Sequence, residues 1–363
     1  MKSFALTVLL VIFIFLSSGK ILVAQSTDEI LEGTITEIPI EEQRPVSDGS
    51  STLYQKLSVL VTKGSLQGET ITIENGTLPY AHIEKYGVGD RVVIQKTQTA
   101  EGTETYMITD YVRRGALAWL FVIFVLLVIA IGGKWGIASL LGMGISFLII
   151  MFFMLPRILN GAPPVVISLI SSLVIVPVTF YLSHGFNAKT HIAIFGTLAT
   201  LSITGMIASL TIDTAHLTGY ATEEAGFLEV QRAGTINMQG LLLAGIIIGV
   251  LGVLDDVTVS QAAIVQQLKK ANVKFHFQQL FSRAMSVGRD HIASLVNTLV
   301  LVYTGASLPL LLLFINNPRP FSEIINYEFV SDEIIRTLVG SIGLVLAVPI
   351  TTAVASFIFS RGK

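Results

Sequence analysis

The chain has 363 residues, of which 52% are hydrophobic and only 13% are charged, and its formal net charge is −2. Soluble globular proteins carry about 25% charged residues, so this composition excludes an ordinary soluble protein and indicates an integral membrane protein. A near-neutral charge offers nucleic acid no basic surface, and we expect no nucleic-acid partner. Because the chain has no cysteine, disulfides, thiolate metal sites and cysteine nucleophiles are also excluded.

The first apolar run extends from Phe4 to Ala24 and follows a single Lys2. Its short basic start and the small Ala24 favour a cleaved signal peptide over residues 1–25. An uncleaved N-terminal anchor is the alternative, because about 20 apolar residues suffice to span a bilayer.

Residues 26–114 are polar, rich in turns and alternating in hydropathy, and we expect them to form an extracytoplasmic β domain. Five short strands in one small domain are typical of a closed all-β barrel of the OB or SH3-like kind. Such a domain either binds a ligand or partner or acts as a folded spacer. The predicted strands are Gly33–Ile38, Leu53–Thr62, Glu69–Glu74, Arg91–Lys96 and Thr105–Val112.

Residues 115–363 are predicted to form a seven-helix transmembrane domain, which makes the chain a mainly α-helical polytopic membrane protein in the lipid bilayer. The seven apolar segments are Ala116–Gly133, Trp135–Leu155, Pro164–Leu182, His191–Ile212, Ile236–Val257, His291–Ile315 and Ile334–Phe359.

Basic residues gather in alternate loops, which are therefore expected on the cytoplasmic side of a bacterial cell membrane. This orientation places residues 26–114 outside and the C-terminus inside, although Arg113 and Arg114 on the outer side count against it. The inner basic residues are Lys134, Lys189, Lys269, Lys270, Lys274, Arg283, Arg289, Arg361 and Lys363.

Two adjacent carboxylates, Asp255 and Asp256, interrupt the fifth apolar segment. A carboxylate at the bilayer centre costs about 2.5–3.5 kcal/mol, so such residues are functional candidates. If the span ends at Leu254, the pair lies at the interface. If it runs from Leu243 to Val265, the pair lies near the middle. The late first lysine, Lys269, favours the deeper frame.

A glycine stripe on the same helix face as Asp256 predicts close packing against another helix. The stripe consists of Gly245, Gly249 and Gly252. Asp256 would then point into the packed interface and Asp255 to one side of it. Adjacent carboxylates in a low dielectric raise each other's proton affinity, which suits a proton carrier. The alternative is an interfacial pair that caps the helix or pairs with Arg289.

The following span carries Asp290, His291 and Asn297, which we expect to face the aspartate pair and line a proton or ion path. A boundary histidine and a helix-linking asparagine are the plainer interpretations. Between the two spans, residues 260–288 are predicted to form an amphipathic cytoplasmic segment on the inner leaflet or a partner-docking site.

Several enzyme signatures are missing from the sequence: a P-loop, a nucleophile elbow and a zinc-protease helix. The acidic outer loop with His216 matches no metal-ligand spacing. We therefore expect a protein that is not an enzyme and that has no metal site and no cofactor.

Three phrases make the sequence resemble the YibE/F family of multi-pass bacterial membrane proteins. They are residues 252–261 (GVLDDVTVSQ), 288–298 (GRDHIASLVNT) and 336–349 (RTLVGSIGLVLAVP). The resemblance extends from about Gly33 to the C-terminus, and it implies class and location without assigning catalytic residues.

A partial resemblance links the acidic span and the two that follow it to resistance–nodulation–division permeases, including SecD/SecF. That resemblance implies that Asp255 and Asp256 carry the coupling proton, and that a single such unit needs a homodimer or another membrane partner. The glycine spacing is shifted from that pattern. We therefore expect an ion-coupled permease or export helper of unknown substrate. The alternative is a non-transporting interaction or scaffold protein that uses the outer β domain and the cytoplasmic segment.

Overall fold

The computed structural model describes residues 29–45, 51–77, 83–98, 104–232, 234–315 and 319–361. The predicted signal or anchor lies outside these ranges. The described residues form two compact units, which join between Leu127 and Val128 and are described separately here.

The first unit contains an antiparallel five-stranded sheet in the order β3-β2-β1-β4-β5. All five predicted strands are present. Their bounds are β1 Glu29–Pro45, β2 Ser51–Lys63, β3 Thr70–Asn75, β4 Arg91–Gln98 and β5 Glu104–Tyr111. The long β1 pairs with β2 along most of its length and with β4 near its start, so it forms the centre of the sheet.

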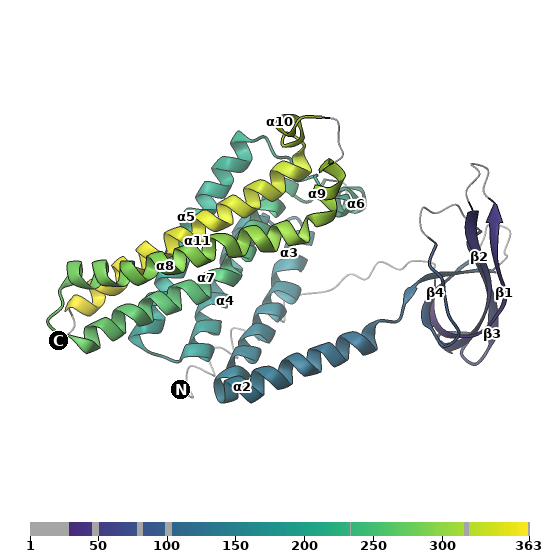
Figure 1. Cartoon of the computed structure of the whole chain (residues 1–363), viewed down its shortest axis with the longest axis horizontal. Coiled ribbons are helices and arrows are strands. Elements are labelled where there is room, and N and C mark those ends of the chain that lie inside the picture. Colours follow the sequence, from purple (N-terminus) through teal and green to yellow (C-terminus); the bar gives the residue numbers. More distant parts are fainter. Residues whose placement is uncertain are drawn as a thin grey trace. The chain divides into compact units, whose positions relative to one another are not determined.

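Alternating side chains form the core of this small sheet, because successive residues of a strand point to opposite faces. Leu31, Ile35, Leu57, Val59 and Ile94 are fully or almost fully buried. The sheet is curled (Figure 1). Its edge strands β3 and β5 approach each other. Among the described residues β3 pairs with β2 alone and β5 with β4 alone. The predicted closed barrel is therefore not confirmed.

The remainder of the described chain is helical (Figure 1). The long helices are α2 Arg114–Ile149, α4 Pro164–His184, α5 Ala188–Thr214, α7 Met238–Ala271, α8 Phe277–Ala306 and α11 Glu328–Arg361. A π-helical turn (η1, Ile150–Met154) and α3 (Leu155–Leu159) continue α2, and the shorter α6 (Glu223–Arg232), α9 (Leu308–Ile315) and α10 (Phe321–Ile324) lie in the connections.

Five of the described helices are long and apolar enough to cross a membrane, or six if α8 and α9, bent by 72°, form one span. The helices therefore fit a multi-pass membrane protein, but the predicted count of seven is not confirmed. The difference arises because the first two predicted segments form a single 46-residue helical run, Arg114–Leu159.

That helical run is interrupted at Gly133, whose φ of 55° and ψ of −135° are not helical. A side chain would be strained at this positive φ, whereas glycine adopts it readily. The interruption lies between the two predicted apolar segments, so the sequence boundary coincides with a real change in the backbone.

The core of the second unit is formed by α5, α7 and α11, and α8 packs mainly against α11. Reciprocal glycine–threonine contacts join α5 to α11: Thr351 lies against Gly196, and Thr204 lies against Gly343. Small residues at such crossings let two helix backbones approach closely.

The predicted amphipathic stretch at 260–288 forms the end of α7, the turn that follows it and the start of α8. Its apolar residues Leu280 and Ala284 are fully buried in the helical core. The Gln261 side-chain amide donates to the Ala284 carbonyl at 3.0 Å and joins the two helices.

Candidate functional site

The acidic pair lies near the middle of α7, which continues without a break from Met238 to Ala271. At 1.5 Å per residue this 34-residue helix is about 50 Å long. One turn beyond the pair, the Thr258 hydroxyl lies 2.8 Å from that of Thr197 within α5. The helix therefore continues well past the acidic pair. That the pair lies near the middle of a membrane span stays a prediction.

Asp255 faces the end of α4, where its Oδ1 lies 3.8 Å from Nε2 of His184. Oδ1 is buried and makes no hydrogen bond with the described residues, although 40% of the side chain is exposed. A movement of less than 1 Å would bring the two groups within hydrogen-bond distance. This arrangement lets a carboxylate and an imidazole hold one proton between them.

The histidine is positioned by the turn that joins α4 to α5. Asn187 donates to the His184 carbonyl at 2.8 Å and accepts from the Thr190 amide at 3.1 Å, which caps α5. The Phe180 ring meets the His184 ring edge-on, with centroids 6.4 Å apart. These contacts fix where α4 ends and therefore where its last side chain points.

Two cavities meet at Asp255. One, of about 360 Å3, extends between α2, α4 and α7. The other, of about 540 Å3, is lined by His184, Lys189 and Trp135. Both cavities are lined by Ser139, Ser183 and Asp255. The carboxylate therefore lies where a solute in either cavity can reach it.

Asp256 and the glycine stripe do not have the packing that the sequence predicted. Gly245, Gly249, Gly252 and Asp256 are exposed. A Cβ added at Gly245 or Gly252 would meet nothing within 4 Å, and one at Gly249 would meet only the Tyr303 hydroxyl. The packed face of α7 is the opposite one, which includes Ala244, Ile247, Leu254 and Thr258.

The three candidates on α8 are not joined to the aspartates. Asp290 and Asn297 are exposed and His291 is half-buried. Within the described ranges no hydrogen bond or ion pair connects any of them to Asp255 or Asp256. The physical reason is that α8 packs along α11, where Gly288 lies against Val348. The helix next in sequence is therefore not the one that completes the acidic site.

His184 and the serines of α2 and α4 were missed by sequence reasoning. The available signal was a histidine at the end of an apolar segment, directly before Gly185. His184 lies two residues beyond the predicted segment Pro164–Leu182, and nothing in the sequence shows that α4 ends beside the middle of α7.

A second polar cluster lies at the opposite end of the bundle, near the start of α11. Asp332 is 4% exposed and pairs with Arg336 at 3.2 Å. Glu328 accepts from the Thr218 amide at 2.6 Å and the Gly219 amide at 2.9 Å, which joins the α5–α6 connection to α11. The Asp332–Arg336 pair lies within α11, and the Glu328 contacts join α11 to the α5–α6 connection. Across the described chain no three His, Asp or Glu side chains are placed to share a metal ion.

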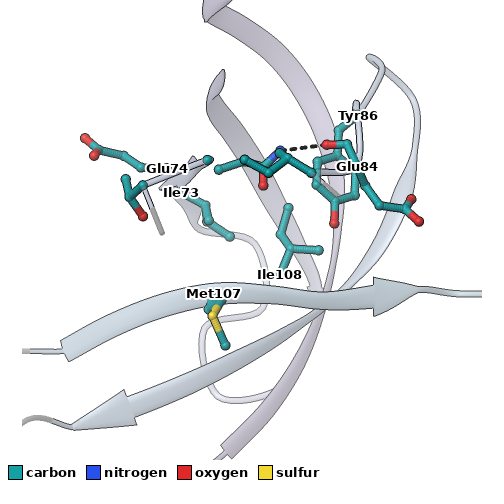
Figure 2. Close-up of a pocket in the computed structure, with 10 residues that line it drawn as sticks. Ile73, Glu74, Glu84, Tyr86, Met107 and Ile108 are labelled. Carbon is teal, nitrogen blue, oxygen red and sulfur yellow. Dashed lines mark hydrogen bonds between the residues drawn. The ribbon is translucent and has the colours of Figure 1, made fainter. Parts of the chain in front are cut away.

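The β domain has a pocket of its own, of about 160 Å3, between β3 and β5 (Figure 2). Ile73 and Ile108 form its floor, and Glu74 and Glu84 lie at its rim. The Asn75 side chain donates to the Glu84 carbonyl at 2.8 Å. Burial raises the pKa of the Tyr86 phenol in this wall to about 12, so this group stays protonated at physiological pH.

Comparison with curated proteins and with solved structures gave no match. A protein-family model, described as YibE/F-like protein, matches residues 120–361, which include all of α4 to α11 and both halves of the Asp255–His184 pair. The chain therefore belongs to the YibE/F-like family.

Proposed function

We propose that this protein is a proton-coupled permease of the bacterial cytoplasmic membrane and not an enzyme. The observation that carries the proposal is the buried Asp255 Oδ1, which lies 3.8 Å from His184 Nε2 at the junction of two cavities. The charge of a histidine changes near neutral pH, so this pair can take up and release a proton under cellular conditions. A polar pair of this kind in a membrane-spanning region typically lines a proton or ion path.

The proposed topology has seven spans. The interruption at Gly133 divides the first helical run into two spans, and α8 and α9 together form one span across the bend after Ala306. The β domain is then outside and the C-terminus inside, as the distribution of basic residues indicates. In this arrangement the turn from α4 to α5, with Lys189, faces the cytoplasm, so the larger cavity opens on the cytoplasmic side. The approach of β3 to β5 supports a barrel that closes in the full domain.

The test uses inside-out membrane vesicles in which respiration builds a pH gradient that a fluorescent dye reports. Na+, K+, Mg2+ and choline are added in turn, and loss of the gradient reports exchange of the cation for protons. We expect at least one cation to dissipate the gradient in vesicles with the wild-type protein. Asp255→Asn should reduce that rate at least tenfold, and His184→Gln should reduce it severalfold.

Asp256→Asn is the matched control, because it makes the same change at the adjacent but exposed residue. It should keep at least half of the wild-type rate at equal protein abundance. The proposal is overturned if none of the four cations dissipates the gradient, or if Asp255→Asn and Asp256→Asn reduce the rate equally.

A further inference from the structure

The cavity of about 360 Å3 is polar at one end and apolar at the other. Its polar end is formed by Asp255, Ser139 and Ser183, the three residues that it shares with the larger cavity. Further along the helices the lining becomes aliphatic, with Ile150 on the π-helical turn and Ile175 and Ile248 on α4 and α7. A ligand that fits this cavity therefore has a polar head and an apolar body.

The charge of that head follows from the ionisable residues. Among the described residues that line this cavity, Asp255 is the single ionisable side chain, and the other polar groups are serine and threonine hydroxyls. An anionic head would be repelled by this carboxylate. When His184 beside it is neutral, a neutral head would leave the carboxylate without a counter-charge in a region of low dielectric, which is costly. A cationic head provides the missing counter-charge.

The size of the cavity separates an organic cation from an inorganic one. A bare metal ion needs only a small cage of oxygen ligands, whereas small-molecule pockets have volumes of roughly 300–1,000 Å3. The volume of the cavity therefore favours a ligand with several carbon atoms.

We infer that this cavity binds a small organic cation with an apolar body, with Asp255 as its counter-ion. The inference rests on the proposed function, since it names the class of solute that a permease would move past the Asp255–His184 pair. Choline is a suitable probe because its charge is permanent, so the charge does not depend on pH. Its neutral isostere, 3,3-dimethyl-1-butanol, has the same shape and a carbon in place of the nitrogen.

Binding can be followed through Trp135, which lines the cavity on the other side of Asp255. The chain has two tryptophans, and replacing the exposed Trp119 by Phe leaves Trp135 as the single reporter. We expect choline to change the Trp135 fluorescence saturably in the purified full-length protein, and the neutral isostere to leave it unchanged. Asp255→Asn should weaken choline binding at least tenfold, and Asp256→Asn should change it less than twofold.

Two further variants show which cavity is used. Ser146 lines only the smaller cavity and Lys189 only the larger one. Ser146→Leu should abolish binding by filling the smaller cavity, whereas Lys189→Gln should preserve it. The inference is overturned if the neutral isostere binds as well as choline, if Asp255→Asn binds normally, or if Ser146→Leu binds normally while remaining folded by circular dichroism.

These outcomes are separate from those of the vesicle assay. If an inorganic cation dissipates the pH gradient but choline does not bind, the permease proposal stands and the substrate class is wrong. If choline binds at Asp255 but no cation dissipates the gradient, the site stands and the transport proposal fails.

Discussion

Replacing Gly196 by alanine should destabilise the helical unit, because the new Cβ would overlap Thr351 Oγ1 and lie 3.2 Å from Thr351 Cβ. Thr351 is fully buried, so it has little room to move. Overpacking of this kind typically costs about 1–3 kcal/mol. At about 1.4 kcal/mol per tenfold change, this packing cost alone corresponds to a rise in the unfolding equilibrium constant by a factor of about 5 to 150.

The control is Gly205→Ala on the same helix, where the added Cβ would make an ordinary contact of 3.7 Å with Ile247 Cδ1. Both variants gain the same helix propensity of up to about 1 kcal/mol. Any difference between them therefore reports packing against α11. The measurement is reversible unfolding of the full chain in mixed micelles, followed by tryptophan fluorescence.

A second variant tests the cause of the expected loss. Thr351→Ala removes the hydroxyl that the new methyl group would strike, so the double variant Gly196→Ala, Thr351→Ala should recover most of the stability lost by Gly196→Ala alone. The reasoning is refuted if Gly196→Ala is as stable as Gly205→Ala, or if the second substitution restores nothing.

Three further expectations concern the ends of the helices and the β domain. Glu328→Ala should speed hydrogen exchange at the Thr218 amide at least tenfold, as mass spectrometry of the 215–220 peptide can measure, because this amide loses its acceptor. The guanidinium of Arg114, at the start of α2, holds the pKa of the Glu32 carboxyl below its ordinary value of 4.5. The ionised Glu32 carboxylate therefore stabilises the fold above pH 4.5 and ceases to do so as the pH falls through the lowered pKa. Glu32→Gln should lower the melting temperature at pH 7, and this effect should disappear as the pH falls below that lowered pKa. Gly133→Ala should cost about 1–3 kcal/mol through its backbone conformation alone, since a Cβ there would meet nothing within 4 Å. The adjacent Gly132→Ala, which also meets nothing, should not destabilise the protein in the same unfolding assay.

Hydropathy was sufficient to predict the five strands and the apolar helical segments of this fold. The alternation in segments such as Leu53–Thr62 predicts strands because one face of the sheet is buried, and all five appeared. The apolar runs predict helices for the corresponding reason. The count of spans was not settled, because apolarity does not show whether Gly133 ends a helix or only interrupts it.

The surroundings of the acidic pair were harder to predict, since they depend on which helices pack together. A glycine stripe indicates a face where another helix could approach, but on α7 it is the larger Ile247 and Leu254 that are buried. Sequence adjacency favoured α8 as the partner of the aspartates. The structure brings α4 there instead, because α8 is held to α11 at Gly288 and Gly340.

The close packing at Gly288 also shows which part of the helical unit resists a change of shape. A Cβ there would lie 2.6 Å from Val348 and 3.1 Å from the Gln261 side chain, so α7, α8 and α11 converge at this point without spare volume. Dense contacts of this kind resist displacement. On the other side of Asp255, α2 approaches α4 near Gly142 and Thr179, and cavities separate the two helices elsewhere. If the protein is the proposed permease, we therefore expect its transport cycle to displace α2 and α4, while α7, α8 and α11 stay in place.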